Sequence, residues 1–323
     1  MVADFTIVGA GALGTILAAL LLRDGHRVNL LCRGARAAQL AEQGLSVSGL
    51  ADIRLPLQPV TRADAIEHCG VLVSAVKTYH MQQALEDCAG LRPELVYSLA
   101  NGIAKTGMLA RQYGEPCTLG CVADFSGELL DSGEVIYTRN NGLYLGEPAG
   151  GRSQRVDAQV ELLQASGLHT IAPDDIRSEE WAKFLAWLPV FVLSVLTRQN
   201  TAAFLQDAGC AQLAQQIIAE AAQLAERDAV ALYDRSLLPS ATLLAQSPEQ
   251  AVATVIETGR ALASTAPGHR MSSLQDLDRG KPLELHETLG FVLEQAERAR
   301  LQTPALRMAF QLINAIDPAR NLA

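Results

Sequence analysis

A glycine-rich turn near the N-terminus is the first feature that could do chemistry. A short apolar run, Phe5–Val8, leads into Gly9-Ala10-Gly11-Ala12-Leu13-Gly14, and an apolar helical stretch follows. In such a unit Gly9 allows a tight turn, Gly11 lets a phosphate approach the backbone, and Gly14 lets the helix pack closely on the strand. The phosphates then bind free N–H groups at the positive helix end. The sequence therefore predicts a dinucleotide site, with a purely structural turn as the alternative, on the backbone of Gly9, Gly11, Ala12, Leu13 and Gly14.

The end of the next strand, Val28–Cys32, indicates which dinucleotide fits. A protein that binds NAD usually places Asp or Glu there to hold the ribose hydroxyls. This chain instead reads Cys32-Arg33-Gly34, without a carboxylate. A guanidinium at Arg33 can hold a 2′-phosphate through a charge-assisted pair of hydrogen bonds. We therefore expect NADP(H) as the cofactor, the alternative being that Arg33 is an ordinary solvated loop cation.

Two further polar residues follow buried strands. Lys77 comes after Val71–Val76, and Asn101 comes after Leu95–Leu99. The carboxyl ends of strands in an open parallel sheet form its ligand-binding edge. Lys77 and Asn101 are therefore candidates for cofactor binding, although Lys and Asn-Gly are also common in ordinary loops.

These residues need a two-domain frame, because 323 residues are about twice the usual domain size. We predict an α/β Rossmann-type domain over residues 1–173, which includes a hairpin from Val135–Thr138 to Leu143–Leu145 through an Asn-Asn-Gly turn. An all-helical domain over residues 174–323 should follow, with helices near 178–196, 202–230, 248–264 and 284–300. The stretch Trp181–Leu196 is apolar nearly all round, which is typical of a buried central helix. Its one cation, Lys183, would by itself be interpreted as a side chain that reaches out to the surface.

Composition excludes several classes of function. Hydrophobic residues make up 49%, enough for a large core, and the formal charge of −9 argues against nucleic acid or an anionic membrane as the partner. We find no uninterrupted apolar stretch of the roughly 18 residues that a membrane span needs. The first residues contain neither a basic region nor a cleavage site, so we expect a cytoplasmic protein with reduced thiols. Cys117 and Cys121 lie close together without a second Cys or His pair nearby, and we expect no metal.

The chain resembles the ketopantoate reductase (2-dehydropantoate 2-reductase) family along almost its whole length. The resemblance rests on five elements in order, with sensible spacing. They are the glycine turn, Lys77, Asn101-Gly102, Glu180-Trp181-Ala182-Lys183-Phe184, and Ser272-Ser273-Leu274-Gln275-Asp276 followed by the helix that begins at Glu284.

The resemblance implies a Rossmann domain joined to a helical domain, with NADPH and a branched 2-oxo acid as ligands. It makes Lys183 the general acid that protonates the carbonyl oxygen as hydride arrives, and it makes Glu284 the residue that positions this lysine and contacts the substrate. Asn101 would lie near the nicotinamide, and Ser272 would contact the substrate. An ammonium suits this chemistry because it stabilises an alkoxide and delivers a proton.

One departure from the family concerns the substrate. Family members usually carry asparagines four and eight residues after the lysine, where this chain has Trp187 and Phe191, with Pro189 between them. Spacing by four places Lys183, Trp187 and Phe191 on one helix face. If both aromatics line the pocket, the substrate should be more apolar than ketopantoate. The competing interpretation is that Pro189 shifts the helix and turns both rings into the core.

Two other functions stay open at this point. One is a protein that senses the NADP(H) ratio without turnover, and the other is a reductive condensation of an amine with a 2-oxo acid, as in opine dehydrogenases. Retention of both Lys183 and Glu284 favours the reductase. The alanine- and leucine-rich helical domain, together with the dimers known in the family, leads us to expect a homodimer.

Overall fold

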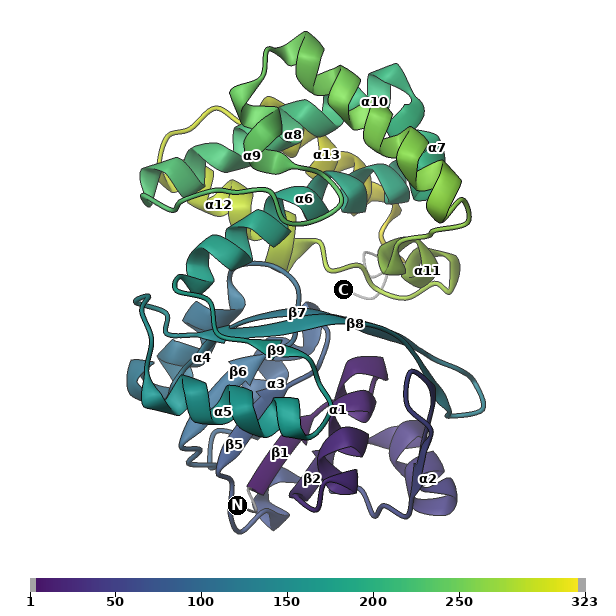
Figure 1. Ribbon diagram of the computed structural model, residues 1–323, viewed down its shortest axis with the longest axis vertical. Coiled ribbons are helices and arrows are strands. Elements are labelled where there is room, and N and C mark those ends of the chain that lie inside the picture. The colour runs from purple at the N-terminus through teal and green to yellow at the C-terminus, as the bar shows by residue number, and fades with distance from the viewer. Residues whose placement is uncertain (1–3, 319–323) are drawn as a thin grey trace. The chain divides into compact units, whose positions relative to one another are not determined.

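The computed structural model describes residues 4–318, and the chain divides into two compact units after Arg177. The boundary expected from the sequence, after residue 173, lies four residues earlier. The first unit is α/β and the second is helical, so the predicted fold class is confirmed (Figure 1).

A parallel four-stranded sheet in the order β2-β1-β5-β6 forms one half of the first unit. Its strands are short and largely buried, and the helices that follow them begin at the carboxyl edge of the sheet. The strands are β1 (Asp4–Val8), β2 (Arg27–Leu31), β5 (Val71–Ser74) and β6 (Leu95–Ser98). The helices are α1 (Ala12–Arg23), α2 (Gly34–Gln43), α3 (Met81–Asp87) and α4 (Lys105–Tyr113).

A second, mixed sheet in the order β4-β3-β8-β7, with β9 paired to β8, completes this unit. Helix α1 contacts β1 and β2 as well as β3, β4, β7 and β8, so it lies in the core between the sheets. Residues 14–21 of α1 are all buried, which explains why nearly all of them are apolar. The strands are β3 (Leu45–Gly49), β4 (Ile53–Leu55), β7 (Gly120–Leu129), β8 (Val135–Gly146) and β9 (Thr170–Ile171), and α5 (Gln154–Ala165) precedes β9. Short 3₁₀ turns occupy Ala63–Ala65, Thr78–His80 and Glu115–Cys117.

The predicted hairpin through Asn140 is wrong, because β8 runs unbroken through that position. It pairs antiparallel with β7, and the register shifts opposite Asp124/Phe125 and Ser126/Gly127 leave Asn141 and Thr138 of β8 as extra residues that absorb the irregularity. The Asn140 side chain accepts from the backbone N–H of His169 (3.1 Å) and donates to the carbonyl of Gly167 (3.2 Å). Asn140 thus ties β8 to the segment before β9 instead of turning the chain.

Within residues 178–318 the second unit contains helices and no strand. A partly buried π-helical turn, η4, leads directly into α12. The helices are α6 (Ile176–Thr197), α7 (Thr201–Gln206), α8 (Ala208–Arg227), α9 (Ser240–Ala245), α10 (Pro248–Thr265), α11 (Ser272–Asp278), α12 (Phe291–Arg298) and α13 (Pro304–Ile316), and η4 spans His286–Gly290.

Helix α6 is, among the described residues, long and apolar enough to cross a bilayer by length and composition, although Lys183 and Pro189 interrupt its apolar run. Within its most apolar window, 78% of the residues are buried inside the protein. The apolar character of α6 is therefore that of a core helix.

The cysteines are free thiols, and within residues 4–318 no group of three His, Cys, Asp or Glu side chains could hold a metal ion. Cys117 lies in a 3₁₀ turn, where its Sγ donates to the carbonyl of Tyr113 (2.9 Å), and Cys121 is buried in β7. These two cysteines therefore serve the packing of the first unit.

Candidate active site

The ends of the four parallel strands bring the first set of candidate residues to one edge of the sheet. The strands are in register, with Val8 opposite both Leu31 and Ser74, and with Ser74 opposite Ser98. One residue from each strand end is a predicted site residue within three positions of it: Gly9, Arg33, Lys77 and Asn101. The structure therefore places them along the edge where open parallel sheets bind ligands.

The three glycines of the turn have the geometry that phosphate binding requires. Gly9 has φ +106°, which favours glycine, and a Cβ on Gly14 would lie 2.0 Å from the carbonyl oxygen of Gly9. Gly14 therefore permits the close packing of α1 against the turn. No atom lies within 4 Å of a Cβ built on Gly11, and Gly11 is exposed. The turn is thus tightly packed at Gly9 and Gly14, whereas the space beside Gly11 is unoccupied by atoms of the described residues.

The first turn of α1 is free to bind an anion. Gly11 is the N-cap, no side chain caps the helix, and its first turn contains no acidic residue. The N–H groups of Ala12, Leu13 and Gly14 therefore keep the partial positive charge of the helix start available. Together with the open side of Gly11, these residues fit the pyrophosphate of a dinucleotide.

Arg33 stands at the N-cap of α2, just beyond β2. Its Nη1 lies 2.9 Å from a carboxylate oxygen of Asp87, and its Nε donates to the carbonyl of Thr61 (3.3 Å). The Arg33 side chain is 56% exposed, and the first turn of α2 contains no acid. Asp87 therefore holds the guanidinium in a solvent-accessible position that an anionic ligand could reach.

Asn101 lies in a loop that a buried lysine stabilises. Lys105 opens α4, is 5% exposed, and donates from Nζ to the carbonyl of Gly102 (2.8 Å). At the start of the same loop, the Ser98 hydroxyl donates to the carbonyl of Ser74 (3.3 Å) and accepts from the N–H of Ala100 (3.2 Å). Sequence reasoning missed Lys105, because only its burial distinguishes it from an ordinary surface lysine.

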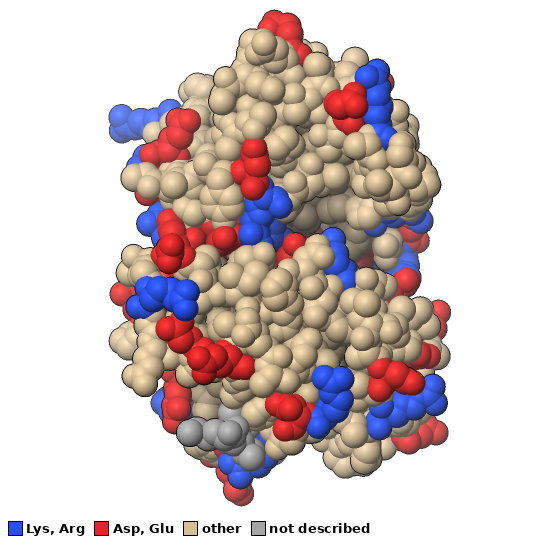
Figure 2. Space-filling model, in the orientation of Figure 1, with Lys and Arg blue, Asp and Glu red and all other residues tan. Residues whose placement is uncertain are grey.

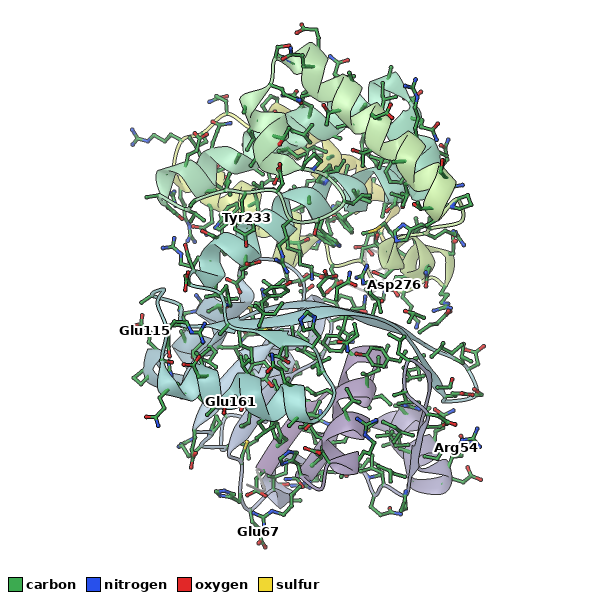
Figure 3. All side chains as sticks on the ribbon, viewed as in Figure 1. Arg54, Glu67, Glu115, Glu161, Tyr233 and Asp276 are labelled. Atoms are coloured by element: carbon green, nitrogen blue, oxygen red, sulfur yellow. The ribbon has the colours of Figure 1, made fainter. Side chains whose placement is uncertain are left out.

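In the second unit, the start of α6 is anchored by a nearly buried ion pair. Arg235 Nη1 lies 2.5 Å from Glu179 Oε2, and the two side chains are 12% and 11% exposed. Tyr233, labelled in Figure 3, belongs to the loop between α8 and α9; burial and then the Glu179 carboxylate raise the pKa of its hydroxyl. Lys183 follows Glu179 by four residues and is half-buried. The ion pair therefore fixes the turn of α6 that precedes the lysine.

An aromatic stack continues along α6 from this lysine. The ring of Trp187 stacks on Phe191, with centroids 4.9 Å apart and planes at 16°, and on Phe184, with centroids 6.1 Å apart. Trp187 is half-buried, whereas Phe191 is 0% exposed. The helix continues through Pro189. The buried ring of Phe191 thus packs against one face of the Trp187 indole. Of these two side chains, only Trp187 has exposed surface that a ligand could contact.

Ser272 and its neighbour have different surroundings. Ser272 opens α11 and is exposed, whereas Ser273 is 7% exposed and its hydroxyl lies 3.1 Å from that of Ser194 on α6. The Ser194 hydroxyl also bonds to the carbonyl of Phe191 (2.9 Å). The Ser194–Ser273 pair therefore attaches α11, and with it Ser272, to the helix that carries Lys183.

Glu284 is 7% exposed and lies two residues before the π-helical turn η4. In this turn the N–H of Gly290 donates to the carbonyl of Leu285 (2.9 Å), five residues back. Glu287 lies within this turn. Burial raises the pKa of its carboxyl, and the nearby charges of Glu284 and Asp317 raise it further. Single π-turns occur often at functional sites, and this one carries Glu287 and follows closely after Glu284, whose charge acts on Glu287.

Comparison with known proteins identifies the family. Residues 5–150 match the family model described as Ketopantoate reductase PanE/ApbA, and residues 175–317 match Ketopantoate reductase PanE/ApbA C terminal. The chain belongs to the ketopantoate reductase family. A 2-dehydropantoate 2-reductase of Mesorhizobium japonicum is 27% identical over 98% of this chain and 98% of its own.

Two solved structures show the same fold. A PanE/ApbA family ketopantoate reductase from Ralstonia eutropha has a TM-score of 0.83 at 21% identity, and the match covers 99% of this chain and 100% of that one. A D-mandelate dehydrogenase in a ternary structure with NADH and anilino(oxo)acetate has a TM-score of 0.82 at 18% identity, with coverage of 98% and 99%.

As a ketopantoate reductase family member, this chain is an oxidoreductase that uses a nicotinamide dinucleotide to reduce a 2-oxo acid. On the face shown in Figure 2, Lys and Arg side chains lie among Asp and Glu side chains rather than together in one area. That face therefore offers no broad basic surface of the kind that binds nucleic acid.

Proposed function

We propose that this ketopantoate reductase family member reduces a 2-oxo acid to the 2-hydroxy acid with NADPH. The observation that carries the proposal is that Lys183 and Glu284 are both present in a chain whose glycine turn is open at Gly11; the family resemblance makes these two residues a proton donor and its carboxylate partner. A protein that only senses the NADP(H) ratio has no need of this pair.

The coenzyme, when bound, supplies a hydride to the carbonyl carbon of the substrate. The ammonium of Lys183 donates a proton to the carbonyl oxygen as negative charge develops there, and it stabilises that charge before the transfer. Glu284 positions the lysine and contacts the reacting substrate oxygen, from which it can accept a hydrogen bond once reduction has made that oxygen a hydroxyl; Ser272 contacts the substrate. In the first unit, Lys77 and Asn101 contact the coenzyme, while the N–H groups at the start of α1 hold its pyrophosphate.

The proposed preference for NADPH rests on Arg33. A 2′-phosphate would replace Asp87 as the partner of this guanidinium, and it carries more negative charge than one carboxylate. The gain should be about 1.5–3 kcal/mol, the scale of a hydrogen bond to a charged group. Fluorescence titration tests this: Arg33→Gln should abolish the preference for NADPH over NADH, and Asp87→Asn should increase it. Equal affinities in the wild-type protein would remove Arg33 from the site.

The proposed substrate is a 2-oxo acid with an alkyl or aromatic tail. Trp187 offers a flat apolar face where the family usually has an amide. The buried ring of Phe191 stacks against the indole and keeps it in this position. Each buried CH₂ group would add about 0.8 kcal/mol of binding free energy, whereas an unpaired hydroxyl would cost about 1–3 kcal/mol. The similar D-mandelate dehydrogenase, whose structure holds an aromatic oxo acid derivative, supports the proposal of a substrate with an apolar tail.

One assay tests the whole proposal. NADPH oxidation is followed with ketopantoate, alkyl 2-oxo acids and phenylglyoxylate, each with and without added amines. We expect turnover without amine and the highest kcat/KM for the apolar acids. Turnover that requires an amine would replace the reductase with a reductive condensation, and tight NADPH binding without any turnover would replace it with a sensor.

We also propose that the protein is a homodimer. On α13 the side chains of Met308, Leu312 and Ile316 follow one another by four residues and are 62%, 50% and 40% exposed. Such a stripe can pack against its own copy across a two-fold axis. Light scattering should give twice the chain mass, and Leu312→Glu should give the monomer; a monomeric wild-type protein would contradict the proposal.

A further inference from the structure

Arg36, three residues after Arg33, reaches back from α2 to the glycine turn. Its Nε donates to the carbonyl of Ala10 (3.0 Å), and its Nη2 donates to the hydroxyl of Thr15 (3.2 Å). The Thr15 hydroxyl in turn donates to the same Ala10 carbonyl (3.2 Å). One carbonyl oxygen of the turn is therefore held by two donors.

The remaining donor of this guanidinium attaches the turn to a distant part of the unit. Arg36 Nη1 donates to Gln39 Oε1 (2.8 Å) and to the carbonyl of Gly133 (3.0 Å), in the loop between β7 and β8. The amide of Gln39 donates to the carbonyl of Asp131 in that loop (3.2 Å). Arg36 thus joins α1, α2, the glycine turn and the β7–β8 loop in one network.

The orientation of the Ala10–Gly11 peptide follows from these bonds. In a planar trans peptide the C=O and the N–H point in opposite directions. Because the Ala10 oxygen is held toward Arg36 and Thr15, the Gly11 N–H points the other way. A Cβ on Gly11 would meet no atom within 4 Å, so the open side of the turn is available to a ligand.

The charge of Arg36 lacks an anionic partner in the described part of the chain. Its four acceptors are carbonyl, amide and hydroxyl oxygens, and no carboxylate lies within ion-pair distance. Burial lowers the pKa of the guanidinium, and only the thiol of Cys32 acts against this. A half-buried cation beside the positive end of α1 is costly unless an anion offsets it.

We propose that Arg36 is a positioning residue for the dinucleotide: it orients the Ala10–Gly11 peptide toward the pyrophosphate, and the pyrophosphate balances its charge. The proposal rests on the dinucleotide-binding function above and adds a residue to it. The pyrophosphate is common to NADPH, NADH and ADP. Arg36 therefore raises the affinity for all three, whereas Arg33 discriminates between NADPH and NADH.

Titration of folded Arg36→Gln with NADPH, NADH and ADP tests this. We expect all three affinities to fall by a similar factor of about tenfold or more, the scale of one charged hydrogen bond. The dependence of NADH affinity on salt should also weaken, a change that loss of packing alone would not produce. Arg111→Gln, which removes an exposed arginine at the far end of α4, is the matched control and should change neither quantity.

Two variants keep the test decisive if Arg36→Gln does not fold. Arg36→Lys keeps the positive charge but removes the several N–H donors of the guanidinium. Thr15→Val removes one donor to the Ala10 carbonyl while preserving the shape of the side chain. Each should weaken NADH and ADP binding less than Arg36→Gln does. Unchanged affinities would overturn the inference, as would a loss confined to NADPH, which would make Arg36 a ligand of the 2′-phosphate. A wild-type protein that binds no dinucleotide would instead contradict the proposed function itself.

Discussion

The two units position their candidate residues in different ways. In the first unit, four strand ends in register place Gly9, Arg33, Lys77 and Asn101 along one edge, and backbone N–H groups at the start of α1 are part of the proposed dinucleotide site. In the helical unit, the candidates are side chains on α6 and α11 and beside η4, which ion pairs, hydroxyls and stacked rings hold. Substitutions in the first unit should therefore affect dinucleotide binding, through backbone geometry at the glycines and through side-chain charge at Arg33. Substitutions in the second unit should affect the chemical step through single functional groups.

The largest effect is expected at Lys183. Lys183→Ala should lower turnover by about 10²–10⁴-fold, the usual contribution of a positioned acid. It should leave NADPH affinity nearly intact, because the proposed coenzyme contacts lie in the other unit. Steady-state kinetics and fluorescence titration measure the two quantities. Glu284→Gln should act in the same direction but less strongly.

Lys281→Ala is the matched control, since Lys281 is an exposed lysine of the same unit. It should leave turnover unchanged. If Lys183→Ala loses folding instead of turnover, the lysine is structural and the contrast between the units disappears.

Two glycines of the first unit should separate folding from binding. Gly14→Ala places a Cβ 2.0 Å from a backbone oxygen, and we expect it to destabilise the unit by about 3 kcal/mol, at the upper end for overpacking. Gly11→Ala meets no atom, so thermal unfolding should be unchanged while NADH affinity falls about tenfold or more through the lost approach of the phosphates. Equal losses of stability in both variants would contradict the open side at Gly11.

The sequence predicts much of the first unit, because its elements depend on local patterns. The strands β1, β2, β5 and β6 match the expected ones to within two residues, and the turn follows from glycine spacing alone. The failure at Asn140 is instructive: Asn-Asn-Gly favours a turn locally, but pairing with β7 and bonds to residues 167 and 169 keep it extended.

Long-range packing explains what the sequence left out. Arg36 differs from Arg33 only through contacts that the fold creates, including one to Gly133, 97 positions away. Helical spacing places Trp187 and Phe191 on one face, but it does not predict that Phe191 is 0% exposed while Trp187 is only half-buried. The difference between exposed Ser272 and buried Ser273 likewise depends on Ser194 of α6.

A smaller effect is expected from Trp187→Asn, which restores the amide usual in the family. Relative to an apolar 2-oxo acid, ketopantoate should gain about tenfold in kcat/KM, the scale of one hydroxyl that regains its partner. The ratio of the two kcat/KM values measures this independently of enzyme concentration. A wild-type protein that uses ketopantoate far better than any apolar acid would end this interpretation, as would a variant that only loses stability.

The smallest effects concern two carboxylates whose pKa values shift in opposite directions. Burial raises the pKa of Glu287, and its Oε2 has no hydrogen-bond partner among the described residues. The folded state therefore favours the protonated form, and stability falls as pH rises from about 4.5, the ordinary value, through the folded pKa. Glu287→Gln should raise stability at pH 7 by about 1 kcal/mol and change little at pH 4.

Glu147 in the first unit provides the comparison of opposite sign. Arg155 Nε donates to it at 2.7 Å, and this bond and that from Ser153 lower the pKa of Glu147. The stabilisation is present above about pH 4.5 and is lost as pH falls through the lower folded pKa. Glu147→Gln should therefore cost about 1 kcal/mol at pH 7, after allowance for solvent screening, and should converge on wild type in acid. Thermal melts from pH 3 to 8 measure both variants, and parallel curves would contradict the assignment.

The number of residues in the π-helical turn His286–Gly290 determines the direction in which Glu284 points relative to α12. A regular α-helix advances about 100° around its axis for each residue. The widened turn takes up one residue more than a regular turn before α12 begins, and so sets the angle between Glu284 and that helix. Deletion of the exposed His286 would restore a regular helix and rotate the carboxylate by about 100°. Every functional group would still be present after such a deletion, yet the carboxylate would face another direction.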